Sequence, residues 1–166
     1  TPYGPEYLAG EPRGEVRRFA RAMIDAGASL VLGHGPHVLR GLEQYRGKLI
    51  AYSLGNFCTF GRFNISGPLG VGMVLKVKLD ARSGCFLGGK IHSTVQTEQG
   101  PVVPDPQGKA VTSVRELSRL DFPLTSPTIE EDGTLVPLPG DGEGLLLTES
   151  EKDTRARAAL LEELEA

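Results

Sequence analysis

The sequence lacks the features that would assign it to several common functional classes. It has no excess of basic residues, because 18 Lys and Arg stand against 21 Asp and Glu in 166 residues, giving a net charge of −3. We therefore expect no nucleic-acid partner. No apolar run approaches the roughly 20 residues that a membrane-spanning helix needs, and nothing resembles a signal peptide. Any membrane association is expected through a segment outside this chain, which begins at Thr1.

Cysteine and histidine are also scarce. The two cysteines, Cys58 and Cys85, have no metal-site spacing, and we expect free, buried thiols. With 39% hydrophobic residues, the chain is long enough for one domain with a core. We place that domain at residues 1–100, followed by a Pro- and Gly-rich extension with one short helix at 101–149 and a C-terminal helix at 150–166.

The clearest predicted element is an amphipathic helix after Pro12. Its apolar side chains recur at helical spacing, and Gly27 marks its end. They are Val16, Phe19, Ala20, Met23 and Ile24. The next segment, Leu30-Val31-Leu32, is wholly apolar, as is typical of a strand buried on both faces of a sheet. A helix followed by a buried strand predicts an α/β fold.

Most of the remaining elements are predicted to be strands. A tight turn at Arg46-Gly47 and alternating apolar residues elsewhere indicate hairpins. The predictions are an entry loop at 1–10, strands at 38–45 and 48–53, a loop at 56–70, strands at 71–79 and 85–95, a helix at 107–120, an extended arm at 123–144 with short edge strands near Ile129, Leu135 and Val136, and a terminal helix at 150–166. The inward series of 85–95 includes Cys85, Leu87 and Ile91, so His92 is expected on the exposed face.

Two of the three histidines lie together where the first predicted strand ends, in Gly33-His34-Gly35-Pro36-His37. Neutral imidazole is a common ligand of transition metals, and two rings three residues apart on a turn can converge on one ion or on two adjacent ions. The glycines permit a sharp turn and Pro36 stiffens it. The structural alternative is that one ring caps the strand and the other is an ordinary loop residue. We favour metal or phosphate chemistry.

Three further residues are candidates for supporting roles. Glu43 either orients an imidazole from a neighbouring strand or is an exposed strand carboxylate. Arg40 either binds an anion through two hydrogen bonds or is an ordinary surface arginine, which we favour. Asn56 either ligates an ion or, as we favour, holds its loop by hydrogen bonds from its side chain to the backbone.

The order of motifs resembles one known family. The helix sequence Phe19-Ala20-Arg21-Ala22-Met23-Ile24-Asp25-Ala26-Gly27 precedes the histidine loop, which is followed by Gly41-Leu42-Glu43 and Ile50-Ala51-Tyr52-Ser53-Leu54-Gly55-Asn56-Phe57. This order resembles the CapA family of bacterial poly-γ-glutamate capsule biosynthesis proteins. The resemblance implies a calcineurin-like metallophosphoesterase type of α/β fold, a sheet core with flanking helices. It also implies that residues 1–100 form the C-terminal half of that domain, whose N-terminal half is missing.

The resemblance also implies a metal centre. His34 and His37 match the family's Gly-His-x-Pro-His loop and would help to hold two divalent ions, while the carboxylates and an Asn would come from the missing half. Glu6 lies in Tyr3-Gly4-Pro5-Glu6-Tyr7, similar to the family's His-Trp-Gly-x-Glu-Tyr, and is a candidate substrate contact. Two departures stand out: Pro2 replaces the family's His, and Gly35 replaces a further His found in many relatives.

The expected function is that of a CapA-like protein, a metal-dependent hydrolase or transferase in the biosynthesis of an anionic polymer such as poly-γ-glutamate. Its expected ligands are that polymer or a phosphorylated small molecule, next to a membrane-associated synthesis complex. We expect the isolated chain to be inactive. The alternative is a non-catalytic CapA-like module that binds polymer or partner proteins.

Overall fold

The computed structural model describes residues 6–8, 11–59, 64–96 and 101–139. The elements of this part are β1 (Glu6–Leu8), β2 (Glu11–Gly14), α1 (Val16–Asp25), β3 (Leu30–Leu32), β4 (Leu42–Tyr45), β5 (Lys48–Ala51), the 3-10 helix η1 (Gly67–Gly70), β6 (Val71–Leu79), β7 (Phe86–Gln96), β8 (Val102–Pro104), α2 (Lys109–Asp121), β9 (Thr128–Ile129) and β10 (Thr134–Val136). Sheets and helices occur together, so the predicted α/β class is confirmed at that level.

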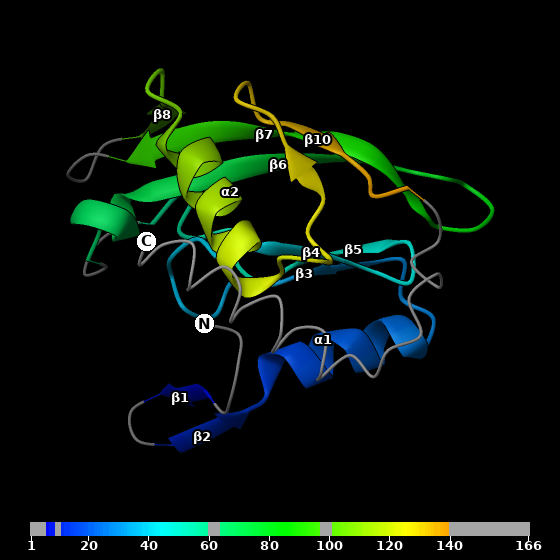
Figure 1. Ribbon diagram of the computed structural model, residues 1–166. Helices are drawn as coiled ribbons and strands as arrows, with labels where there is room; N and C mark the ends of the chain where they lie inside the picture. The colour runs from blue at the N-terminus through cyan, green and yellow to red at the C-terminus, as the bar shows by residue number, and fades with distance from the viewer. Residues whose placement is uncertain (1–5, 9–10, 60–63, 97–100, 140–166) are drawn as a thin grey trace, which may run out of the picture.

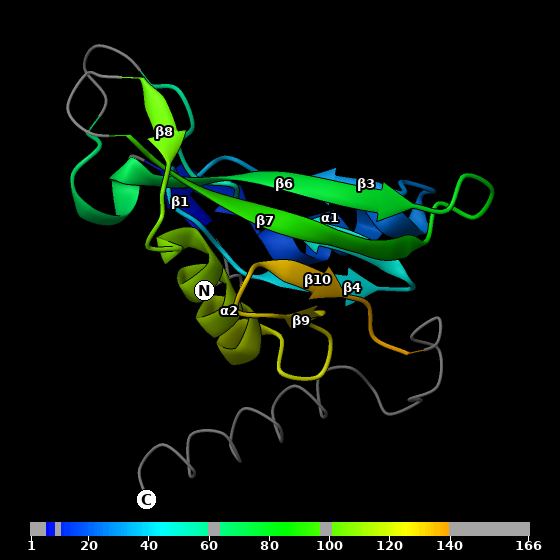
Figure 2. The same ribbon diagram turned by 90° about the horizontal axis from the view of Figure 1, so that it is seen from above.

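Two sheets stack against each other, and α1 covers the outer side of the smaller one (Figure 1). The smaller sheet has the order β3-β5-β4, and the larger sheet runs β6-β7-β10-β9 with β8 also paired to β7. The main core lies between these sheets and beneath α2, around Leu42, Leu49, Met73, Ile91 and Val114. Figure 2 shows β6, β7 and β10 side by side with α2 beside them. A third, separate sheet is the two-stranded pair β1-β2. The expected sheet core is thus built from two stacked sheets.

The smaller sheet joins one parallel pair to one hairpin. β3 lies parallel to β5, with Val31 opposite Ile50, and β4 returns antiparallel to β5. Arg46 and Gly47 both have positive φ, 49° and 69°, as a type I′ turn requires. The predicted hairpin is therefore confirmed, although its strands are shorter than predicted. The prediction that β3 is buried on both faces is wrong, because Leu32 is 50% exposed.

The helix α1 is present where predicted but is rotated about its axis. Ala20 and Ile24 are buried, whereas Phe19 is 61% exposed and Met23 lies at the surface. Arg17 and Arg21 occupy the inward face beside Ala20 because they bind a buried carboxylate, described below. Of the predicted apolar stripe, Ala20 and Ile24 are therefore buried among the described residues, and Phe19 and Met23 are not.

A register irregularity in the β6–β7 hairpin changes which residues of β7 face inward. The shift falls between Lys78 and Leu79, so that Leu79 pairs with Phe86. Phe86 is buried and Leu87 is 49% exposed, the reverse of the prediction. The prediction is confirmed at Ile91, which is buried, and at His92, which is exposed, but near the end of β7 Thr94 is buried and Val95 only half-buried, the reverse of the prediction.

Three other predictions are corrected. The thiols of Cys58 and Cys85 are free but are exposed and half-buried, respectively. Part of the predicted entry loop forms the β1–β2 hairpin. Strand β10 pairs with β7 on one side and β9 on the other, and its Leu135 is buried, so it is an internal strand of the sheet.

The predicted helix at 150–166 lies outside the described residues. Among the described residues, no helix has the length and apolar character to span a membrane.

Candidate functional site

The histidine loop and the Ser-Leu-Gly-Asn loop lie side by side at the carboxyl ends of the two parallel strands. The Gly33 N–H donates to the Ala51 carbonyl at 2.8 Å, and the Leu54 N–H donates to the Gly33 carbonyl at 2.9 Å. These bonds continue the β3–β5 pairing into the loops. Crevices at the carboxyl ends of parallel strands are where α/β proteins bind ligands.

The side chains of His37 and Asn56 connect the two loops. His37 Nδ1 lies 2.7 Å from Asn56 Oδ1, and Asn56 Nδ2 donates to the Leu69 carbonyl at 3.0 Å. Because a carbonyl only accepts, the Leu69 bond fixes the Asn56 amide with its oxygen toward the imidazole. His37 Nδ1 therefore carries a proton and donates it, which leaves the Nε2 lone pair of a neutral ring for a metal ion. Asn56 also makes the side-chain bond to the backbone that we had favoured for it.

The backbone of His37 is unusual for its residue type. Its φ is 60°, in the left-handed region that few non-glycine residues occupy. The turn is closed by the His37 N–H, which donates to the His34 carbonyl at 3.4 Å. His34 and His37 are both solvent-exposed residues.

The described residues do not complete a metal centre. Among them, no group of three His, Cys, Asp or Glu side chains is arranged to hold an ion. The two imidazoles fit the donor chemistry of a transition metal, but further ligands would have to come from outside this part of the chain.

Arg40 and Glu6 are the remaining candidates. Arg40 is half-buried, and its backbone N–H donates to the Ser53 carbonyl at 3.2 Å. Glu6 lies in β1, and its side chain is outside the described part.

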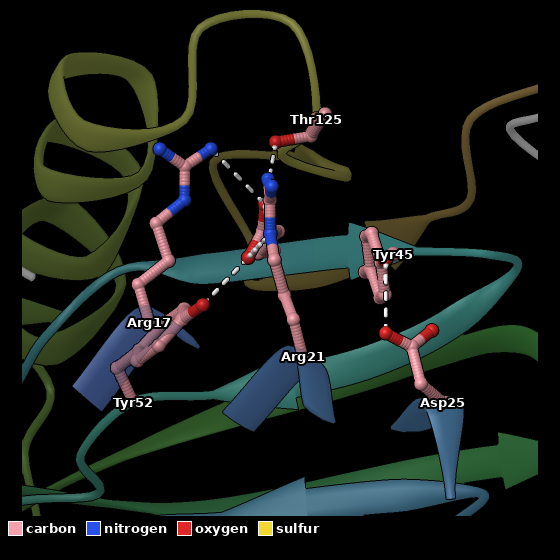
Figure 3. A network of polar contacts seen from close by, with 7 residues as sticks. Arg17, Arg21, Asp25, Tyr45, Tyr52 and Thr125 are labelled. Atoms are coloured by element: carbon pink, nitrogen blue, oxygen red, sulfur yellow. Dashed lines mark hydrogen bonds and ion pairs between the residues drawn. The ribbon is translucent and has the colours of Figure 1, made fainter. Parts of the chain in front are cut away.

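Glu43 is completely buried, so the exposed-carboxylate alternative is wrong. Its partners among the described residues come from three segments and do not include an imidazole (Figure 3). Arg21 binds both carboxylate oxygens, with Nε at 3.1 and 3.3 Å and Nη2 also on Oε1. The Tyr52 hydroxyl donates to Oε2 at 2.6 Å, and the Thr125 hydroxyl donates to Oε1 at 3.1 Å. Arg17 forms an ion pair with the same carboxylate, with its Nη2 3.6 Å from Oε1. We call these five side chains the Glu43 network.

Aromatic rings enclose the Glu43 network. Tyr52 stacks on Phe122 with centroids 4.9 Å apart, and the Arg17 guanidinium lies over Phe122 at 5.6 Å. The Arg21 guanidinium lies over Tyr45 at 4.8 Å. Burial, followed by the adjacent Glu43 carboxylate, raises the pKa of Tyr52 well above its usual value, so the hydroxyl remains a donor. The network is a structural clamp that joins α1, β4, the end of β5 and the segment after α2.

Sequence reasoning missed the roles of Arg17, Arg21, Tyr52 and Thr125. A usable signal was present, because Arg17 and Arg21 are four residues apart on one helix face and the predicted strand carries an acidic residue directly after Leu42. The Thr125 contact joins residues 82 apart and has no local signal.

The segment that contains both loops matches a known family. Residues 3–60 match the model described as "Bacterial capsule synthesis protein PGA_cap". Over this segment, which is about a third of the chain, the sequence is similar to the CapA family.

Individual relatives resemble the same third of the chain. The "PGA biosynthesis protein CapA" of Bacillus subtilis is 53% identical over 55 residues, which are 33% of this chain and 14% of that protein. The "Capsule biosynthesis protein CapA" of Bacillus anthracis is 46% identical over 57 residues, 34% of this chain and 14% of that protein. An uncharacterized protein of Sinorhizobium fredii, y4sH, is 55% identical over 53 residues, 32% of this chain and 12% of that protein.

The matched part therefore spans about one seventh of the two named CapA proteins. Within this CapA segment lie the histidine loop, Asn56, Glu43 and both arginines of the network. Leu69 and Thr125, which fix Asn56 and Glu43, lie beyond it.

The first prediction concerns the Glu43 network. Glu43→Ala leaves two half-buried guanidinium groups without this counter-charge, and should lower the free energy of unfolding by about 3–5 kcal/mol. Glu43→Gln, which retains an acceptor oxygen, should cost less. Urea unfolding followed by circular dichroism gives both values.

Lys90→Ala is the matched control, because Lys90 forms an exposed ion pair with Asp132 at 2.7 Å and its removal leaves the hydrogen bonds that Thr134 donates to Asp132 in place. This variant should leave stability essentially unchanged. Equal losses for Glu43→Ala and Lys90→Ala would contradict the assigned role of burial.

The second prediction separates the two glycines of the histidine loop. A Cβ at Gly33 would lie far inside van der Waals contact with the Tyr52 carbonyl oxygen, whereas a Cβ at Gly35 would meet nothing within 4 Å. Gly33→Ala should therefore destabilise the protein by about 1–3 kcal/mol through overpacking, and Gly35→Ala should be nearly neutral. Thermal unfolding of both variants checks the difference, and comparable midpoints would refute it.

Proposed function

We propose that this chain acts as a CapA-like protein in the biosynthesis of poly-γ-glutamate or a related anionic polymer. The proposed activity is metal-dependent hydrolysis or transfer at a phosphate-like or carboxyl-phosphate-like group. The names of the two Bacillus relatives support a role in making such a polymer. The matched segments are 14% of each relative, so the activity of the whole protein is part of this proposal.

The observation that carries the proposal is the hydrogen bond between His37 and Asn56. Outer partners of this kind fix the tautomer and the orientation of a metal-binding imidazole. With Nδ1 protonated, His37 would ligate through Nε2, and His34 on the same turn would supply a second imidazole. These two histidines would supply the metal ligands that come from the ends of β3 and β5. The proposed domain is of the calcineurin-like type.

When bound, two divalent ions would polarise the substrate group and generate hydroxide near neutral pH. This chain's own residues contribute ligands and orientation. Asn56 holds the ring of His37, and Arg40 and Glu6 are further proposed substrate contacts. The proposed site of action is beside a membrane-associated synthesis complex.

A second candidate is a non-catalytic module that binds polymer or partner proteins. It is favoured by the lack of a three-ligand cluster among the described residues. The two candidates differ in whether the chain retains an ion through its histidine loop.

The test is retention of Zn²⁺ or Mn²⁺ by the full chain, measured by mass spectrometry after dialysis against a metal buffer. We expect near-stoichiometric metal that is lost in both His34→Ala and His37→Ala. His92→Ala is the control, because His92 is exposed on β7 away from the loop, and it should retain the metal. Retention unaffected by both loop variants, or no retention in the unaltered chain, would overturn the metal proposal in favour of the module.

A further inference from the structure

A groove opens directly beside the histidine loop. It has a volume of about 420 Å³ and lies between the residues that follow His37, the 3-10 helix η1 and one face of α2. Val38, Leu39, Pro68 and Leu117 supply apolar wall, and Lys109 and Ser113 supply polar groups.

The same short segment forms the groove and orients His37. Pro68 lines the groove, and the carbonyl of the next residue, Leu69, accepts the bond that fixes Asn56. A ligand in the groove would therefore contact Val38, the residue after His37. It would also contact the segment whose Leu69 carbonyl fixes Asn56, and through Asn56 the imidazole of His37.

The charge in the groove is confined to one end. Lys109, Ser113 and Leu117 are four residues apart along α2, so they line one face over about 12 Å. Among the described residues that line the groove, Lys109 is the single charged one, and its ammonium forms no ion pair with another described residue. Its backbone N–H is already satisfied by Asp105 at 2.9 Å. The lining thus presents one cation at the start of an apolar wall.

We infer that this groove binds a segment of a carboxylate-bearing polymer, an inference that rests on the function proposed above. The methylene groups of a γ-linked glutamate chain would lie against Val38, Leu39 and Leu117. One carboxylate would pair with Lys109, and the Ser113 hydroxyl would bind a polar group between them. Apolar walls with few placed polar groups are typical of ligand sites.

Another basic surface of the chain has a different explanation. Lys76 and Lys78 are exposed on β6, an edge strand of the larger sheet. Edge lysines prevent unwanted strand pairing, and these two lie outside the groove lining. They therefore provide a matched control for charge.

The test measures binding of a fluorescein-labelled γ-linked glutamate oligomer to the full chain by anisotropy, without added metal. Lys109→Glu should weaken binding about threefold to tenfold, because it replaces one attraction with a repulsion. Lys78→Glu makes the same change in net charge and should leave binding unaltered. Ser113→Leu should also weaken binding by filling the groove without changing its charge.

Equal effects of Lys109→Glu and Lys78→Glu, or no effect of Lys109→Glu and Ser113→Leu, would overturn the inference. A second copy of the chain as occupant would also overturn it, and would appear in sedimentation as self-association that Ser113→Leu abolishes while oligomer binding persists. Oligomer binding that depends on Lys109 in a chain that retains no metal would leave the groove standing and reject the metal centre. Metal retention by the unaltered chain, together with normal oligomer binding by Lys109→Glu, would leave the metal centre standing and reject the groove.

Discussion

The burial of one carboxylate constrains much of this structure. Glu43 has no contact with solvent, and an ionised carboxylate in such a place requires several donors at close range. It receives them from α1, from the end of β5 and from the segment after α2. These three parts are distant in the sequence, so the requirement fixes how they are placed around β4. The same requirement explains why α1 directs two arginines inward and leaves Phe19 at the surface.

This clamp and the candidate site share one scaffold. Tyr52, which binds Glu43, directly precedes the Ser-Leu-Gly-Asn loop, and its carbonyl oxygen lies so close to Gly33 that no side chain fits there. The two loops are thereby held together at the ends of β3 and β5. Asn56 then connects its own loop to the histidine loop through His37, and to η1 through the carbonyl of Leu69. The orientation of an exposed imidazole thus depends on contacts made beneath it, as precise ligand sites require.

Sequence reasoning succeeded where local pattern determines structure. The helix at α1, the turn at Arg46-Gly47, the exposed position of His92 and the helix at α2 all follow from periodicity or turn chemistry. It failed where a distant contact decides. The rotation of α1 depends on Glu43, 22 residues from Arg21, and the internal position of β10 depends on pairing with β7. For the site, the histidine loop was visible as a motif, but the bond between His37 and Asn56 required the parallel pairing of β3 with β5.

The central proposal is that His37 would present a lone pair on Nε2 to a metal ion, because Asn56 holds the proton on Nδ1. Nuclear magnetic resonance of the chain labelled with ¹⁵N at histidine tests it most directly, by assigning the ring nitrogens before and during a Zn²⁺ titration. The account predicts a protonated Nδ1 in His37, a Zn²⁺-dependent shift of its Nε2, and no comparable change in His92. A proton on Nε2 of His37, or equal responses of His37 and His92 to Zn²⁺, would contradict it.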